Sequence, residues 1–477
     1  MRAFSKFLKP GSVIDLPLSF VVRDLLAELF AKVTESHRKA DREINDFLRR
    51  QRRLSAPERE FIARTIYAMI RHRRALQDAA RALPFKPSAH TFVLLHLLGS
   101  THLRAQDLPR PDAEIEPVLA ALSAHRRRPP PEDPAEALAQ AHSLPGWLAA
   151  ELLKLCGEEG GALLAAALKR PPPLTLRANL LRGDRDGLRG RLAREGVRTT
   201  PTRYSPVGLT VIGHARVMQT RAFAEGLFEI QDEGSQLIGL LAEARPGQRV
   251  IDACAGAGGK TLHLAADMDN KGTLLALDAH EHRLDQLRPR ARRAGVHNVQ
   301  THALDAEGSR RLSRLKGSAD VVLVDAPCSG TGALRRNPDD AWRMAEGDVE
   351  RFSEIQRALL ARYAGLVRPG GRLVYATCSM IPEENQRVAE DFLQHHPGFE
   401  ATSAWEVLDR IAAQTPEALD GAPWMRLLPH VHGTDGFFAA VFTRRRGGEG
   451  IEPDEGAVDE DEGRQGGEGG EGGEDRG

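Results

Sequence analysis

Two cysteines of this sequence have the type and the surroundings to do covalent chemistry. Cys328 lies in the segment Asp-Ala-Pro-Cys-Ser-Gly-Thr-Gly, and Cys378 lies in Tyr-Ala-Thr-Cys-Ser. The proline and glycines around Cys328 predict a tight loop that exposes its thiol. A thiolate is a good nucleophile once its pKa is lowered, whereas a single cysteine is more often structural. Two thiols amid small or polar residues, each at the end of a predicted strand, favour a catalytic pair.

A glycine-rich turn is the second chemical feature. It reads Cys254, Ala255, Gly256, Ala257, Gly258, Gly259 and Lys260, and it lies between a predicted strand and a predicted helix. Glycines let the backbone approach a ligand closely, and a helix N-terminus offers free N–H groups. The turn therefore suits either a phosphate or the adenosine and amino-acid ends of S-adenosyl-L-methionine. The P-loop pattern G-x-x-x-x-G-K-[ST] would require glycine at position 254, where this chain has cysteine, so the pattern fails by one residue.

Carboxylates follow the same predicted strands. Asp278 lies 26 residues after Asp252, near the offset of roughly 20 residues at which an acidic residue meets ribose hydroxyls in dinucleotide folds. Asp305 ends the third predicted strand, where it could reach the adenine edge. Any one of these residues would more often be a helix cap or turn residue, but three in register predict a binding crevice. These residues alone leave a nicotinamide enzyme open as an alternative.

The elements that must position these residues form an alternating pattern. From Gly247 to about Arg444, strand and helix patterns alternate, which is typical of a parallel α/β sheet. In a doubly wound sheet the fourth and fifth strands are neighbours, so both thiols should face the crevice of the glycine turn. The predicted strands cover residues 249–252, 273–278, 299–304, 321–325, 372–377 and 437–442, with helices that include 280–294 and 350–366.

Three other regions flank this domain of residues 239–446. Residues 1–140 are predicted to be helical, with a capping box at Ser55 and Glu58 and a helix over 91–103. Residues 141–238 are predicted to hold a helical pair over 147–169, stopped by prolines, and a small α+β module. The module has strands near 173–181, 208–212 and 227–231 and a helix over 184–195. Residues 447–477 are rich in glycine and glutamate and should be disordered.

The net charge of zero hides an asymmetry. From Gly447 onward there are 12 acidic and 2 basic residues, so the rest of the chain carries 64 basic against 54 acidic residues. A moderately basic body suits a polyanionic partner, although most surface charge is merely solvated. Arginines crowd the N-terminal helices, where they form either a solvated face or a surface for the RNA backbone: Arg49, Arg50, Arg52, Arg53, Arg71, Arg73 and Arg74.

Other classes of protein are disfavoured. The sequence has no stretch of 18 apolar residues, and its N-terminus lacks the pattern of a signal peptide, so a membrane protein is not expected. The four cysteines lie far apart without a C-x-x-C pair, which argues against a metal site and a disulfide framework and favours a reducing cytoplasm. Cys156 lies on an apolar helix face and is expected to be structural.

The quoted motifs resemble those of the RNA 5-methylcytosine methyltransferases of the RsmB/Nop2/NSUN family. The family's cofactor motif is roughly D-x-C-A-[AG]-P-G-G-K-T, and this chain has DACAGAGGKT, with Ala257 in place of the proline. The two cysteine segments match without a gap, and so do residues 228–236, 336–339, 382–385 and 435–438. The resemblance runs from about Leu144 to Arg444. The N-terminal helices resemble the NusB-like RNA-binding domain of bacterial RsmB-type enzymes more loosely.

This resemblance implies a Rossmann-like class I S-adenosyl-L-methionine-dependent methyltransferase domain, preceded by an α+β RNA-binding module and an all-α NusB-like domain. It implies methylation of cytosine C5 in a structured RNA, with 16S rRNA the foremost target, by an enzyme expected to be monomeric. Cys378 would attack C6, Asp325 would bind the N3/N4 edge, and Cys328 would assist loss of the C5 proton and release of Cys378. Residues 254–260, Asp278, Asp305 and Asp325 would hold the cofactor. The target base must leave its stack to be reached.

Three alternatives remain open. The same chemistry could act on tRNA or 23S rRNA. A P-loop-like NTPase is disfavoured by Cys254 and leaves both loop cysteines unexplained. A non-catalytic RNA-binding protein is disfavoured because both cysteines and the strand-end carboxylates are present.

Overall fold

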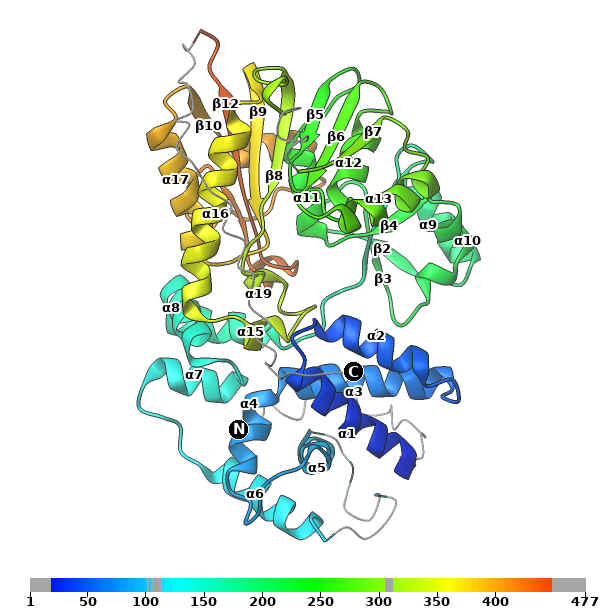
Figure 1. The fold of residues 1–477 in the computed structure, drawn as a ribbon, viewed down its shortest axis with the longest axis vertical. Coiled ribbons are helices and arrows are strands. Elements are labelled where there is room, and N and C mark those ends of the chain that lie inside the picture. Colours follow the sequence, from blue (N-terminus) through cyan, green and yellow to red (C-terminus); the bar gives the residue numbers. More distant parts are fainter. Residues whose placement is uncertain (1–18, 101–102, 104–107, 109–112, 305–311, 448–477) are drawn as a thin grey trace, which may run out of the picture.

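A helical bundle lies below a large sheet, with a smaller sheet beside it (Figure 1). The computed structural model describes residues 19–100, 103, 108, 113–304 and 312–447. The acidic tail from residue 448 and Asp305 therefore lie outside the described residues. Within these ranges, none of the helices combines the length and apolarity needed to cross a bilayer.

The N-terminal bundle is built on apolar residues at helical spacing. Leu26, Ile62 and Ile66 have no exposed surface and belong to one core. The predicted capping box is confirmed: the Ser55 hydroxyl accepts the Glu58 N–H, and the Glu58 carboxylate accepts the Ser55 N–H at 2.7 Å. The helices are α1 (Phe20–Glu35), α2 (Ala40–Arg50), α3 (Ala56–Arg71), α4 (Arg73–Ala80), α5 (Ala89–Ser100) and α6 (Ile115–Arg127). The helix predicted over 91–103 is α5, which begins two residues earlier.

A connecting pair of helices leads to a small antiparallel sheet. α7 (Pro134–His142) precedes α8 (Gly146–Leu168), which is kinked at Gly157, where φ is 69°. The sheet has the order β2-β3-β1-β4. Its elements are β1 (Thr175–Ala178), α9 (Arg185–Arg194), β2 (Thr199–Pro201), β3 (Gly208–Val211), η2 (Val217–Gln219), α10 (Arg221–Ala224) and β4 (Phe228–Ile230). The sequence did not predict β2, a three-residue edge strand that ends in proline.

The large sheet has the order β10-β12-β9-β8-β5-β6-β7, with β11 paired to β12. The pairs among β5 to β9 are parallel, whereas β12 runs antiparallel to β9. The α/β prediction and all six predicted strands are confirmed; β10 and β11 were not predicted. The strands are β5 (Arg249–Asp252), β6 (Thr273–Asp278), β7 (Val299–Ala303), β8 (Ala319–Asp325), β9 (Val367–Thr377), β10 (Phe399–Thr402), β11 (Met425–Leu427) and β12 (Phe437–Arg444).

Helices cover both faces of this sheet, so its strands are apolar on both sides. Within β8, Val321 and Leu323 belong to one core cluster while Val322 and Val324 belong to the other. The first cluster packs against α11 (Glu233–Leu241), α12 (Gly259–Asp267), α13 (Glu281–Ala294) and α18 (Ala404–Ile411). The second packs against α16 (Glu346–Ala364) and α17 (Gln386–His395). The chain order reverses between β5 and β8, which is where open α/β sheets bind ligands.

A short segment after the Cys328 loop joins the large sheet to the bundle. It contains η3 (Thr331–Ala333) and α15 (Asp340–Arg343). The Asp339 carboxylate accepts the backbone N–H of Ala40 at 2.9 Å, at the start of α2. The Arg343 guanidinium donates to the carbonyl of His37 at 2.6 Å, just after α1. The bundle is therefore hydrogen-bonded to the chain that leaves the Cys328 loop.

Candidate active site

The two predicted cysteines lie together at the ends of adjacent parallel strands. Asp325 of β8 is in register with Ala376 of β9, and each strand runs directly into a cysteine loop. The Sγ atoms of Cys328 and Cys378 are 3.3 Å apart. The expected neighbourhood of the two strand ends therefore brings the two thiols together.

A buried carboxylate that the sequence did not single out joins the two cysteine loops. Glu384, in η4 (Pro382–Glu384), has no exposed surface. It accepts the Ser329 N–H at 2.7 Å, and its other oxygen accepts the hydroxyl of Ser379 at 2.5 Å and that of Ser329. Gln356 of α16 donates to it at 3.1 Å. Ser329 follows Cys328 and Ser379 follows Cys378, so Glu384 fixes the separation of the two thiols.

A backbone contact holds the same two loops. The Gly332 N–H donates to the Cys378 carbonyl at 2.9 Å, and Gly436 donates to the Gly332 carbonyl at 2.9 Å. A Cβ added at Gly332 would come within 2.8 Å of the Cys378 carbonyl oxygen and would collide with Gly436. Glycine is required at this position because the backbones approach so closely.

The glycine turn follows β5 at the switch point of the sheet. Gly256 and Gly258 have φ values of 54° and 87°, in the left-handed region. The Asp278 carboxylate accepts the Gly256 N–H at 2.9 Å and the His280 N–H at 2.8 Å, so it shapes the turn directly. A Cβ built at Gly256 would meet no atom within 4 Å, so this side of the turn has open space beside it. The turn and Asp278 thus form a cradle that fits an adenosine-type cofactor.

Ala257 stands where the related motif has proline, and a side chain from outside the turn holds it in place. The carbonyl of Ala257 accepts the guanidinium of Arg290 at 2.6 Å. Arg290, on α13, also forms an ion pair of 2.9 Å with Glu229 of β4. The turn is therefore held from outside by a charged pair, a feature that a local motif cannot reveal.

Lys260 connects the cofactor turn to the cysteine loop. Its Nζ lies 2.6 Å from Oδ2 of Asp325, and the two side chains are 10% and 29% exposed. Burial of Lys260 opposes its charge, but the ion pair and hydrogen bond with Asp325 outweigh it and raise the pKa of Lys260. Asp325 therefore faces a positive charge and links the turn to the strand that leads into the Cys328 loop.

Burial acts in the same direction on the pKa of the thiols of Cys328, Cys254 and Cys156. The hydrogen bond between the two thiols of Cys328 and Cys378, together with burial, raises the pKa of Cys328 well above its usual range. Burial likewise raises the pKa of Cys254, which lies in the turn beside Asp252. Cys156 on α8 is half-buried, and burial raises its pKa also. Since the pKa of Cys328 is raised as well, what distinguishes Cys328 from Cys254 and Cys156 is the second thiol, that of Cys378, 3.3 Å away.

The parallel core, the switch point and the glycine turn define a class I S-adenosyl-L-methionine-dependent methyltransferase. Comparison with known families agrees with this class. The family model described as 16S rRNA methyltransferase RsmB/F matches residues 240–443. The model described as the RsmF/B-like methyltransferase ferredoxin-like domain matches residues 144–218.

Individual relatives extend the match. The probable ribosomal RNA small subunit methyltransferase B of Bacillus subtilis is 35% identical over 315 residues, which cover 66% of this chain and 69% of that protein. The protein of the same name from Synechocystis is 31% identical over 420 residues, or 81% and 91%. The crystal structure of a methyltransferase homologue from Pyrococcus horikoshii has a TM-score of 0.56 and 28% identity, over 64% of this chain and 97% of that one. The chain belongs to the RsmB/F family, and it is an S-adenosyl-L-methionine-dependent RNA methyltransferase.

Proposed function

We propose that this enzyme methylates C5 of a cytosine in RNA through a covalent bond between Cys378 and C6 of the base. The observation that carries the proposal is the pair of thiols 3.3 Å apart. Cytosine C5 is a poor nucleophile, and addition of a thiolate at C6 activates it. S-adenosyl-L-methionine supplies the electrophilic methyl group when bound, and residues 254–260, Asp278, Asp305 and Asp325 would hold it.

Each residue has a defined role in the proposed reaction. Cys378 Sγ forms a bond to C6, and the electron pair of the C5–C6 double bond makes C5 nucleophilic. Asp325, oriented by Lys260, binds the N3/N4 edge of the base and stabilises charge as the adduct forms. After methylation, loss of the C5 proton returns its electron pair to the C5–C6 bond and expels Cys378 as a thiolate. Cys328 assists this proton loss and the release of Cys378, whose sulfur lies 3.3 Å from its own.

We propose small-subunit rRNA as the substrate. The relatives from Bacillus subtilis and Synechocystis carry that RNA in their names. The division proposed for the chain is a NusB-like RNA-binding domain of residues 1–140, a linker with an α+β RNA-binding module of residues 141–238, a catalytic domain of residues 239–446 and a tail of residues 447–477. The enzyme is proposed to act as a monomer in the cytoplasm, where its free cysteines would stay reduced.

Product analysis tests the reaction. The purified enzyme is incubated with labelled S-adenosyl-L-methionine and a 16S rRNA transcript, and the digested nucleosides are separated by mass spectrometry. The expected product is labelled 5-methylcytidine; label in another nucleoside would refute the proposed chemistry. Bisulfite sequencing of total RNA from a deletion strain then identifies the target. Loss of a methylated cytosine from 16S rRNA supports the proposed substrate, whereas loss from tRNA or 23S rRNA would replace it.

A further inference from the structure

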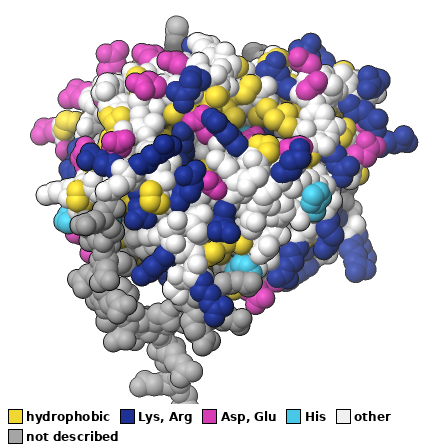
Figure 2. All heavy atoms as spheres, turned by 90° about the horizontal axis from the view of Figure 1, so that it is seen from above, with side chains coloured by type: hydrophobic (Ala, Val, Ile, Leu, Met, Phe, Trp, Pro, Cys, Tyr) yellow, Lys and Arg dark blue, Asp and Glu magenta, His cyan; other side chains and the backbone are white. Residues whose placement is uncertain are grey.

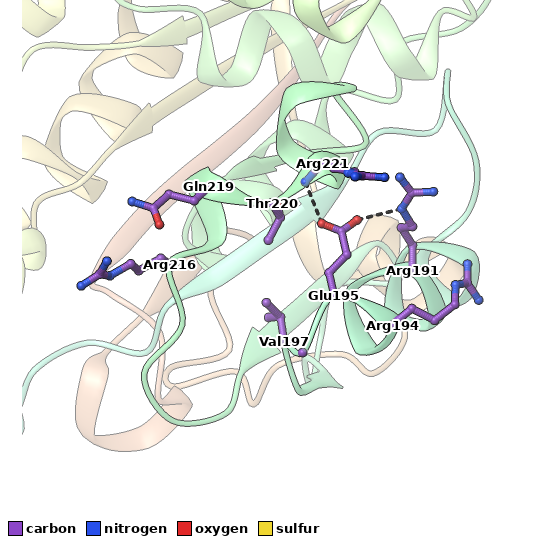
Figure 3. Close-up of a pocket in the computed structure, with 9 residues that line it drawn as sticks. Arg191, Arg194, Glu195, Val197, Arg216, Gln219, Thr220 and Arg221 are labelled. Atoms are coloured by element: carbon purple, nitrogen blue, oxygen red, sulfur yellow. Dashed lines mark hydrogen bonds and ion pairs between the residues drawn. The ribbon is translucent and has the colours of Figure 1, made fainter.

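A hollow on the small α+β module carries an unusual concentration of arginine. It has a volume of about 590 Å³ and is lined by Arg191 and Arg194 of α9, by Arg216, which precedes η2, and by Arg221, the first residue of α10. Figure 3 shows Arg216 and Gln219 on one side of the hollow, with Arg191, Arg194 and Arg221 on the other and Glu195 between them. On the face of the molecule seen in Figure 2, Lys and Arg side chains are spread among acidic and apolar ones.

Most of this positive charge is free to meet a ligand. The carboxylate of Glu195 is already used: it pairs with Arg191 at 2.7 Å and accepts the Arg221 N–H at 2.6 Å. Arg191 also pairs with Glu225 at 2.8 Å. The guanidinium groups of Arg194, Arg216 and Arg221 are exposed and form no hydrogen bond or ion pair with any described residue. Three planar cations thus surround a hollow whose carboxylate is neutralised.

The floor beneath these cations is rigid. Val197 lines the hollow, and Val217 follows Arg216 in the chain. Both are buried in the core of the α+β module, at 5% and 3% exposure. The Glu195 carboxylate joins α9 to α10, because it also accepts the Ala222 N–H at 3.2 Å. The arginines therefore project from backbone whose positions are fixed relative to one another, and a ligand would not have to order the backbone that carries them.

The hollow is also fixed relative to the cofactor turn. Phe223 of α10 lies under the guanidinium of Arg293, with 3.9 Å to the ring centroid. Asn179 donates to the carbonyls of Gly226 and Ala294, each at 2.8 Å. Both contacts dock the module on α13, the helix whose Arg290 holds the turn at Ala257. A ligand held in the hollow is thereby held in a set position with respect to the methyl-transfer site.

We infer that this hollow binds the phosphodiester backbone of the substrate RNA. The inference rests on the RNA methyltransferase function and adds to it a site at which the RNA is held. Guanidinium groups match the geometry of phosphate oxygens and pair with them bidentately. The lining contains no aromatic side chain on which a base could stack. The site therefore contacts phosphates without reading sequence, and it positions the RNA while the catalytic crevice selects the base.

Salt-dependent binding tests this inference on the full chain. The variant Arg194→Ala/Arg216→Ala/Arg221→Ala is compared with Arg410→Ala/Arg445→Ala/Arg446→Ala, which removes the same charge from exposed positions on α18 and after β12. The probe is a fluorescently labelled 16S rRNA transcript, titrated at several salt concentrations. Each phosphate contact contributes a slope of about 0.7 to 0.9 in log K against log salt, so the pocket variant should lose roughly 2 in slope and bind at least about tenfold more weakly.

The control triple should keep the slope and the affinity of the wild type. Calorimetric binding of S-adenosyl-L-methionine, and kcat at saturating RNA, should be unchanged in both variants, because none of the substituted residues lies in the crevice. These measurements separate the two proposals: the binding result stands even if the methylated atom is not cytosine C5. Equal slopes and affinities for the pocket variant and the control would overturn the inference. If the triple variant does not fold, the single charge reversal Arg216→Glu on an exposed side chain decides the question by the same criterion.

Discussion

The catalytic crevice and the arginine hollow use charge in opposite ways. In the crevice, Glu384 is fully buried, the Lys260 side chain is only 10% exposed, and each has a partner within 2.7 Å. In the hollow, three arginines are exposed and unpaired among the described residues. Buried partnered charges fix atoms in place, and their removal leaves an uncompensated group. Exposed charges act through their sum and are screened by salt. Substitutions in the crevice should therefore change kcat strongly, whereas substitutions in the hollow should change RNA affinity in a salt-dependent way.

Among substitutions in the crevice, Asp325→Asn is expected to reduce activity most. It removes the charge that faces Lys260 and the proposed acceptor for the base edge. We expect kcat/KM to fall by about 10²- to 10³-fold, as for removal of other preorganised electrostatic groups. The matched control is Asp320→Asn near the other end of β8, where the carboxylate pairs with Arg368 at 2.7 Å on the surface. A methylation assay in which both variants keep wild-type rates would contradict the role assigned to Asp325.

A second test separates positioning from contact with substrate. The substitution Glu384→Gln places an amide N–H₂ among the donors of Ser329 and Ser379, so the two cysteine loops should shift. Displacement of reacting groups by about 1 Å can cost on the order of 10²-fold, and we expect kcat to fall by about 10- to 10²-fold with RNA affinity unchanged. The adjacent Glu383→Gln alters only a partly exposed pair with Arg387 and should act like the wild type. A change in KM for RNA with constant kcat would argue against the positioning role.

The third test concerns the alanine in the cofactor turn. Removing Arg290 frees the carbonyl of Ala257, and we expect Arg290→Ala to weaken S-adenosyl-L-methionine binding by about 1.5 kcal/mol, or roughly tenfold. Addition of Ala257→Pro should restore affinity more in this variant than in the wild type, because proline stiffens the turn from within. Arg288→Ala, which removes an exposed pair on the same helix, is the control. Isothermal titration measures all of these variants. If Ala257→Pro changes the affinity equally in the wild type and in Arg290→Ala, then Arg290 does not support the turn.

The last test concerns stability and leaves the reaction itself aside. Burial raises the pKa of Asp252 to about 7 from an ordinary value of 3.8. Between these values the folded state holds a proton that the unfolded state lacks, so this contribution to stability is full at low pH and is lost as pH rises to 7 and above. Relative to the wild type, Asp252→Asn should therefore gain stability between about pH 5 and pH 7, by up to about 1.4 kcal/mol per unit. Urea denaturation checks this, with the exposed Asp269→Asn as control. A constant difference between Asp252→Asn and the wild type would show that the Asp252 carboxyl does not titrate in this range.

The sequence predicted what depends on local pattern. Apolar strands alternating with helices gave the six strands of the large sheet that were expected, and the ends of β8 and β9 placed Cys328 and Cys378 together. It could not choose between Glu383 and Glu384, which are neighbours of identical type. The turn of η4 buries one of them and leaves the other partly exposed.

The sequence also could not predict contacts between segments that are far apart in the chain. Glu229 and Arg290 are 61 residues apart, and only the docking of β4 on α13 brings them to the turn. Counting charges predicted a basic body. The position of the hollow depends on Glu195, which neutralises Arg191 and leaves the surrounding arginines free.

The proposed mechanism depends most on the different roles of Cys378 and Cys328. A denaturing gel of enzyme incubated with S-adenosyl-L-methionine and labelled 16S rRNA transcript measures it directly. Cys328→Ala should form the bond to C6 and fail to break it, so an enzyme–RNA adduct should accumulate. Cys378→Ala should form no adduct. An adduct with Cys378→Ala and none with Cys328→Ala would reverse the assignment, and adducts with neither variant would contradict the covalent mechanism.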